Sequence, residues 1–346
     1  MSRFRYLTAL LTCVLFLSTI SFAQDAANDW QALNRQAIEL FRQGKYEDAA
    51  IVGKAALGIA ERSRGPEHPD TSTSLNNLGL VYQTRGDYAA AEALYRRALA
   101  NYEKTLKPND PILAGALNNL AFLYDLRGDV AKAEPLYRRA LKIKERSLGR
   151  NVADTAITAN NLAELLRKRG RFAESETLFA RGIAGLEKVY GVDHVELAYP
   201  LSSLAEIHIA RKNYPKAESF YARALAIREK ALGLEHPLVA LTLNNASSVY
   251  HAQKKYARAE QFVRRALAIR EKTLGPENLE TAYTLNNLAM LRVAQGANDD
   301  AAPLFARALA VVEKTRGPQH PDAVAIRRNL DAARRPSTDA GAPVRP

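Results

Sequence analysis

Cysteine is almost absent from this sequence, with one residue, Cys13, among 346. Cys13 lies inside the apolar run near the N-terminus, whereas a lipid-modified cysteine ends its apolar segment. A lone cysteine excludes intrachain disulfides and cysteine-ligated zinc. The chain also lacks a glycine-rich phosphate loop, a nucleophile elbow and a zinc motif. We therefore expect no catalytic, metal-binding or cofactor-binding residues, no cofactor, and a protein that is not an enzyme.

Acidic residues are fewer than basic ones, 37 against 49, and the formal net charge is +12. A basic surplus raises nucleic acid, an anionic membrane or an acidic polymer as partners, and the placement of the charges has to decide among them. Hydrophobic residues make up 47% of the chain, a proportion typical of a folded protein.

The N-terminal segment has the features of a secretory leader. Two arginines precede an apolar run from Leu7 to about Ile20, and small residues occupy the peptidase positions of Ser21-Phe22-Ala23. The apolar run is short for a membrane span. We expect a signal peptide over residues 1–23 and an exported protein, periplasmic or secreted. The alternative is an uncleaved N-terminal anchor.

A tetrad containing paired asparagines repeats along the chain at an interval of 42 residues. Its copies begin at Leu75, Leu117, Ala159, Leu201, Leu243 and Leu285. The same register runs without insertion from Leu33 to Leu330. A fixed period of this length indicates stacked structural repeats, so the repeat decides the fold class.

Each repeat contains two helical patterns. Leu75, Leu78 and Tyr82 fall on one helix stripe, and a second stripe follows the Arg85-Gly86-Asp87 turn signal. The loop Gly65–Asp70 contains a glycine and two prolines, which end one helix and begin the next. We expect Asp70 to be the N-cap of the helix that follows.

The small and aromatic positions of the unit are similar to a known signature. The spacing of Leu78-Gly79, Tyr82, Gly86, Ala91, Tyr95 and Ala98 resembles the tetratricopeptide repeat. The 42-residue length, with LNNLA and EKxLGPEHP segments, resembles the kinesin light chain class. The resemblance covers residues 29–335. It implies an all-α fold, an α-α superhelix of about seven helix-turn-helix units plus a C-terminal capping helix, with the first helices on the concave side. We expect a disordered tail over 336–346.

In the family that the chain resembles, the second asparagine of each pair lies on the concave face. The corresponding residues here are Asn77, Asn119, Asn161, Asn245 and Asn287. An amide both donates and accepts hydrogen bonds, so a row of them could hold the backbone of an extended peptide. The alternative is that the amides bridge adjacent first helices. Ser202-Ser203 interrupts the row.

Other concave positions would select the peptide that the amides hold. The candidate residues are Phe122, Arg167, Lys168, Tyr199, Leu241 and Tyr283. Apolar, aromatic and charged side chains are mixed among them. The chain lacks the basic set with which some relatives bind a C-terminal carboxylate, so no relative's ligand is assigned to it.

The basic surplus repeats together with acids. An arginine recurs every 42 residues from Arg97 to Arg307, and a glutamate does so from Glu103 to Glu313. This pattern favours ion pairs between neighbouring second helices over a surface for an anionic polymer, and we expect no nucleic acid partner.

The histidines follow the repeat in most places. His68, His194, His236 and His320 share one loop register, so we interpret them as part of the scaffold. His208 stands where other units have tyrosine, which indicates a packing role. His251 is out of pattern on the concave side, with no second ligand at metal-binding spacing.

The sequence therefore predicts an exported, non-enzymatic scaffold or adaptor that binds a peptide or protein segment in a concave groove. The alternative is a structural or assembly subunit of a cell-envelope complex that binds through convex or edge surfaces. Contact with a membrane would occur only through partners or an uncleaved leader. The sequence leaves the oligomeric state and the partner open.

Overall fold

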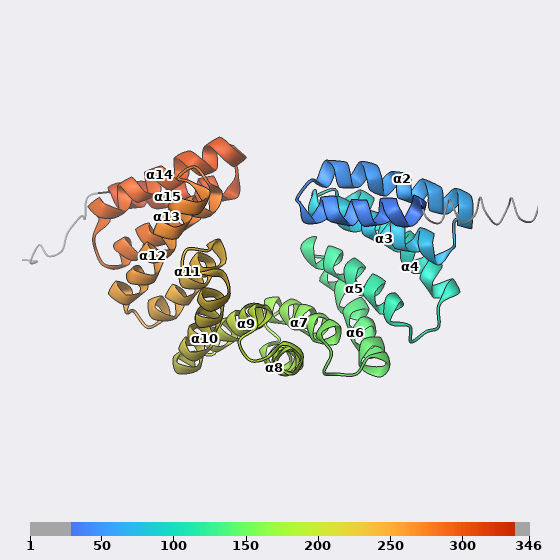
Figure 1. The fold of residues 1–346 in the computed structure, drawn as a ribbon. Helices are drawn as coiled ribbons and strands as arrows, with labels where there is room; N and C mark the ends of the chain where they lie inside the picture. The colour runs from blue at the N-terminus through green and yellow to red at the C-terminus, as the bar shows by residue number, and fades with distance from the viewer. Residues whose placement is uncertain (1–28, 336–346) are drawn as a thin grey trace, which may run out of the picture. The chain divides into compact units, whose positions relative to one another are not determined.

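The computed structural model describes residues 29–335, and every regular element among them is a helix. The expected signal peptide 1–23, with Cys13, and the expected tail 336–346 lie outside the described residues. The chain divides into two compact units, residues 1–171 and 172–346, which are described separately (Figure 1).

The first unit contains an initial helix over residues 29–42 and six further helices. These are α2 Tyr46–Arg64, α3 Pro69–Thr84, α4 Tyr88–Thr105, α5 Pro111–Leu126, α6 Val130–Ser147 and α7 Ala153–Lys168. Each of them from α2 to α7 packs against the next one along the chain. The odd-numbered helices α3, α5 and α7 also contact one another in order. Here they are called first helices, together with helix 29–42.

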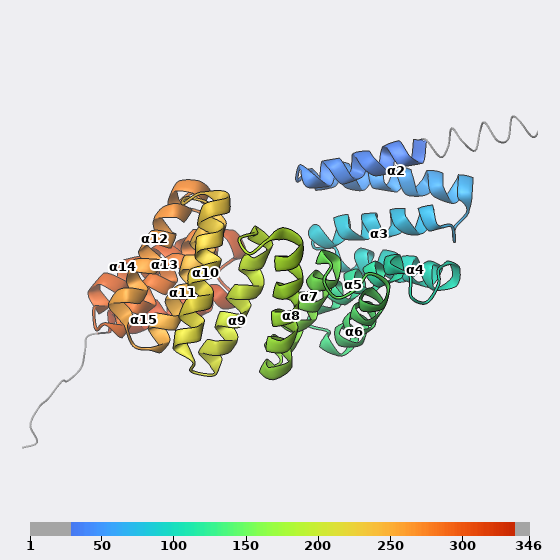
Figure 2. The same ribbon diagram turned by 60° about the horizontal axis from the view of Figure 1, so that its bottom comes forward.

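The second unit continues the same alternation to the end of the described chain (Figure 2). Its helices are α8 Phe172–Tyr190, α9 Ala198–Ala210, α10 Tyr214–Leu232, α11 Pro237–Ala252, α12 Tyr256–Leu274, α13 Leu279–Ala294, α14 Asn298–Arg316 and α15 Pro321–Arg334. A short 3-10 turn, Val195–Leu197, precedes α9. The first helices of this unit are α9, α11 and α13. Within each unit the described helices alternate between first and second helices, and α15 is the last of them, which confirms the predicted helical-repeat solenoid.

Most of the labelled first helices that follow a loop begin at a residue whose side chain caps them, as in α3, α5, α11 and α13. The prediction that Asp70 caps α3 was wrong, because Pro69 starts the helix and His68 is the N-cap. His68 has extended backbone, and its Nδ1 accepts the backbone N–H of Asp70 at 3.1 Å. A proline is favoured at the first helical position because it has no N–H to satisfy there. The cap therefore falls two residues before the expected place.

The turn inside each helix pair needs one residue in the left-handed region. Gly86, with φ of 83°, supplies it between α3 and α4. Lys212 and Lys254 occupy the same register with φ of 59° in the second unit. A residue with a Cβ is strained in that conformation, so these two turns are less favourable than the others.

The core lies where the two helices of a pair cross, and its recurring element is an aromatic ring on a small residue. The Tyr95 ring of α4 is 1% exposed and covers Gly79 of α3. A Cβ on Gly79 would stand 2.8 Å from that ring, so only glycine allows the approach. No helix among residues 29–335 is both long and apolar enough to cross a membrane.

Candidate functional site

The paired asparagines link successive first helices through side-chain hydrogen bonds. The second amide of each pair donates through Nδ2 to the first amide of the preceding repeat. The four bonds are Asn77 to Asn34 at 3.0 Å, Asn119 to Asn76 at 3.0 Å, Asn161 to Asn118 at 3.2 Å and Asn287 to Asn244 at 3.0 Å. We call these four bonds the asparagine ladder. Four of the five predicted peptide-binding amides therefore use one N–H within the scaffold.

The ladder is missing at Asn245. Its partner in register is Ser202, whose hydroxyl donates to the Ala198 carbonyl of its own helix at 2.8 Å. Within residues 29–335 the Asn245 side chain makes no hydrogen bond, although it is only partly exposed. Asn245 is thus the one second-position amide among the five with both N–H groups and its oxygen available to a ligand.

Asn245 lines a pocket of about 440 Å³ in the second unit, between the faces of α9, α11 and α13. We call it the Asn245 pocket. It is lined by Glu206, Tyr221, Asn244, Asn245, Ser247, Ser248, His251, Asn287, Met290 and Leu291. The polar groups are mainly amides and hydroxyls, and Met290, 42% exposed, adds an apolar contact. The amides and hydroxyls of this wall can pair with a peptide backbone, and the Glu206 carboxylate adds a negative charge.

The other candidates of the second unit share a register one turn away from the ladder. Tyr199 is 46% exposed on α9, and Leu241 is partly buried on α11. Tyr283 of α13 donates its hydroxyl to Asp322 of the terminal helix at 2.6 Å. Partial burial and this hydrogen bond raise the Tyr283 pKa above its ordinary value. None of the three lines the Asn245 pocket.

The charged candidates of the first unit are paired with neighbours. Arg167 donates to Glu164 one helical turn earlier at 2.7 and 2.9 Å. Lys168 donates to Asp125 of α5 at 3.1 and 3.2 Å. Phe122 is 37% exposed on α5. A ligand would meet these cations as members of ion pairs.

A repeated glutamate on the second helices ties each repeat to the next one, a role that the sequence analysis missed. Glu92 of α4 accepts from the Tyr124 hydroxyl at 3.0 Å, and Glu260 of α12 accepts from Arg292 at 2.6 Å. Burial alone would raise the pKa of Glu260. Hydrogen bonds from Arg264 and Gln295 and the charge of Arg292 outweigh it, so this pKa lies below its ordinary value. The recurrence of a glutamate every 42 residues from Glu92 to Glu260 was the available signal.

The second helices carry ion pairs between neighbours, as the paired registers predicted. The pairs include Arg97 with Glu61 at 2.7 Å, Arg139 with Glu103, Arg223 with Glu187 at 2.6 Å, Arg265 with Glu229 at 2.6 Å and Arg307 with Glu271 at 2.8 Å. This confirms the interpretation as internal pairing. Pairs exposed to this degree each contribute little to stability.

The loop histidines cap helices, which confirms their scaffold role. His194, His236 and His320 each accept a backbone N–H two residues ahead through Nδ1, at 3.4, 3.1 and 3.2 Å. His208 is buried and stacks on Phe220 at 5.5 Å, as its register predicted. Among residues 29–335 no three His, Cys, Asp or Glu side chains gather closely enough to hold a metal ion.

Comparison with known proteins supports one family. A profile of the tetratricopeptide repeat matches seven overlapping segments, residues 31–104, 83–146, 112–188, 154–230, 196–272, 238–314 and 280–330. No curated protein sequence matches the chain significantly. Solenoids of this kind are typically protein-interaction scaffolds without catalysis, and their partners are proteins.

Solved structures show the same fold. The structure of BtubC (BKLC) from P. vanneervenii is 27% identical with a TM-score of 0.54, and the match covers 70% of this chain and 93% of that one. A putative kinesin light chain from Podospora anserina is 24% identical with a TM-score of 0.52, over 60% of this chain and 98% of that one. A Pyrococcus horikoshii signal transduction ATPase with a tetratricopeptide repeat sensor has a TM-score of 0.64 at 14% identity. The match covers 89% of this chain and 44% of that one.

The 42-residue helix pairs and the profile match along nearly all described residues show that the chain belongs to the tetratricopeptide repeat family, and the solved structures that it resembles include a putative kinesin light chain.

Proposed function

We propose that this protein is an exported, non-enzymatic adaptor that binds an extended peptide or protein segment across its first helices, with the Asn245 pocket as a principal contact. The observation that carries the proposal is the free Asn245 amide in a pocket of about 440 Å³. A free amide can pair with both the N–H and the C=O of a peptide group.

The remaining ladder residues support the same mode of binding. Each second-position amide uses one N–H in the scaffold, so its Oδ1 still accepts from a ligand. Because each hydrogen bond contributes only about 0.5–1.5 kcal/mol, binding needs several of them together. The ladder therefore supports both alternatives of the sequence analysis, since it holds the first helices and still presents acceptors.

The test uses the chain without residues 1–23 and a displayed library of random peptides. Asn245→Ala is the informative variant because that side chain holds no scaffold hydrogen bond. We expect selected peptides to bind this variant roughly 2- to 13-fold more weakly, which corresponds to one hydrogen bond, with no change in melting temperature. Peptides that bind Asn245→Ala as well as the wild type would contradict the proposal.

Asn287→Ala is the matched control in the same pocket. It removes a ladder bond of 3.0 Å to Asn244, so it should lower stability as well as binding. Charge reversal at Arg167 or Lys168 is a poorer test, because each cation already holds a carboxylate of the scaffold.

One observation favours the alternative of an assembly subunit. Val192 and Leu234 are 60% and 61% exposed in consecutive loops of the second unit, each after the end of a second helix. Exposed apolar side chains at equivalent loop positions suit an edge contact with another protein. Under this alternative Val192→Ser with Leu234→Ser would abolish partner capture, whereas Asn245→Ala would leave it intact.

Export is part of the proposal and rests on the leader-like residues 1–23. The N-terminal sequence of the protein from the cell envelope or the medium tests it. Cleavage after Ala23 is the expected result, and an intact Met1 would support the anchor instead.

A further inference from the structure

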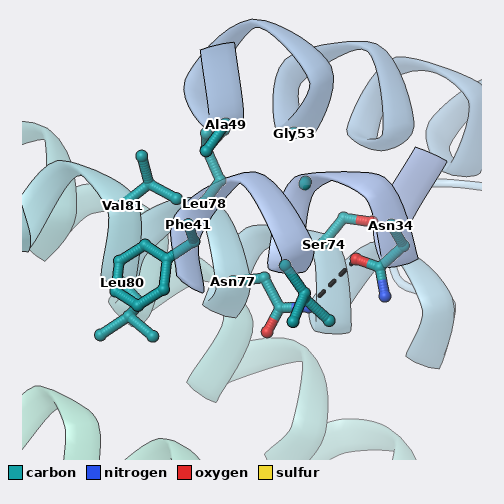
Figure 3. Close-up of a pocket in the computed structure, with 11 residues that line it drawn as sticks. Asn34, Phe41, Ala49, Gly53, Ser74, Asn77, Leu78, Leu80 and Val81 are labelled. Carbon is teal, nitrogen blue, oxygen red and sulfur yellow. Dashed lines mark hydrogen bonds between the residues drawn. The ribbon is translucent and has the colours of Figure 1, made fainter. Parts of the chain in front are cut away.

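The first helix pair contains a cavity where the later pairs contain a side chain. Gly53 of α2 occupies the register in which the following second helices have Tyr95, Tyr137, Phe179, Tyr221, Val263 and Phe305. In the α3–α4 pair the Tyr95 ring fills the crossing point completely. At Gly53 no side chain fills it, and a cavity of about 60 Å³ remains between helix 29–42, α2 and α3 (Figure 3).

The walls of this cavity are mostly apolar. Ile38, Phe41, Leu78 and Val81 are among the apolar residues that line it. A cavity of this volume holds roughly four to six times the space that one water needs. Water inside it would find few hydrogen-bond partners, whereas an aliphatic group would remove apolar surface from solvent. The cavity therefore favours an apolar occupant of about four carbon atoms, which is the size of a leucine side chain.

The mouth of the cavity lies at the start of the asparagine ladder. Leu80, 36% exposed, and the partly exposed Asn34 and Asn77 line it, so the cavity is reached from the first-helix face. The Asn77 amide donates to Asn34 at 3.0 Å (Figure 3). Within residues 29–335 the Asn77 oxygen and the Asn34 amino group make no other hydrogen bond. The Asn77 oxygen, as an acceptor, and the Asn34 amino group, as a donor, can thus both pair with a peptide group beside the apolar cavity.

We propose that this cavity binds a leucine side chain of the partner segment, while Asn34 and Asn77 hold the backbone of the same residue. The inference rests on the proposed function, since it assigns a side chain to the segment that the first helices bind. None of the lining residues is charged, so acidic or basic residues are rejected at this position. The absent ring of the first repeat is replaced by a side chain of the partner.

The direct test uses small blocked amino acids and does not need the natural partner. N-acetyl-leucine N-methylamide is titrated into the methyl-labelled chain, and the NMR signals of Ile38, Leu78, Leu80 and Val81 are followed. We expect saturable shifts in the millimolar range, as befits a ligand of this size. The glycine and glutamate analogues should bind at least tenfold more weakly, because they lack the apolar side chain. Equal shifts from the leucine and glycine compounds would overturn the inference.

Gly53→Phe closes the cavity from the inside. A Cβ on Gly53 stands 3.2 Å from Leu78 Cδ1, a flexible side chain that can move. We expect this variant to lose the leucine-dependent shifts and to melt at a higher temperature. Gly53→Val, the residue type of Val263 in this register, serves if the ring proves too large. A filled variant that melts higher and still binds the leucine compound as the wild type does would refute the proposal. Gly115→Ala, a glycine substitution on α5 away from the cavity, is the matched control and should bind normally.

The outcomes separate this inference from the proposed function. If selected peptides bind Gly53→Phe as well as wild type but are lost from Asn245→Ala, the leucine site is wrong and peptide binding stands. If no displayed peptide binds the wild type, the proposed function fails, and the NMR titration still decides whether the cavity accepts leucine.

Discussion

The break in the asparagine ladder allows a substitution that separates its structural and binding roles. Ser202→Asn would place an amide oxygen 43 residues before Asn245, the separation found in all four ladder bonds. Asparagine occupies the equivalent position at the acceptor end of all four ladder bonds, so this place on a first helix accepts that side chain. We expect the new oxygen to accept one Asn245 N–H.

The expected effects have opposite signs. A neutral hydrogen bond contributes about 0.5–1.5 kcal/mol to the free energy of unfolding. The lost Ser202 hydroxyl bond is a small cost, because the Ala198 carbonyl that it reaches lies within the same helix. A gain of about 1 kcal/mol raises the melting temperature of a unit of this size by roughly 2–4 °C. Peptide affinity should fall, since Asn245 then holds a scaffold partner.

A double-mutant cycle measures the pair. Urea unfolding is compared for wild type, Ser202→Asn, Asn245→Ala and the double variant, with Ser202→Ala as the control that supplies no oxygen. We expect a coupling of about 0.5–1.5 kcal/mol between the introduced amide and the Asn245 side chain. Zero coupling, or stabilisation that persists when position 245 carries alanine, would refute the inference that the ladder bond at Asn245 is missing because residue 202 is a serine.

Three further predictions concern stability. Val152, the N-cap position of α7, makes no side-chain cap bond, whereas Asn278 in the same register accepts at 2.8 Å. Val152→Asn should therefore raise the free energy of unfolding, measured with urea, by about 1 kcal/mol, and Val152→Ala should leave it unchanged. Gly115 lies inside α5 with open space around an added Cβ, so Gly115→Ala should add about 0.5–1 kcal/mol in the same assay. Burial lowers the pKa of His208, so the unfolded chain takes up its proton first. The free energy of unfolding should therefore fall as the pH drops below about 6.5, and the fall should be smaller in His208→Tyr than in the wild type. Equal losses in both proteins would contradict this reasoning.

The repeat made most of the fold predictable. Helix pairs, turns and the small residues at crossings depend on spacings within one 42-residue unit, and these are visible along the chain. The pairing of acids with bases on the second helices was predictable for the same reason, because both registers recur together. The helix start at Pro69 was missed because proline at the first helical position moves the cap to His68.

The sequence by itself determined the period, the class of solenoid and the set of amides from which a binding face can be built. It did not distinguish Asn245 from Asn119, since both follow the same motif. Only the tertiary structure decided that Asn119 is bonded to Asn76 and that Asn245 is free. The difference arises because a hydrogen bond between repeats depends on which side chain the neighbouring helix presents 43 residues away. A cavity, likewise, depends on what surrounds Gly53 from three helices.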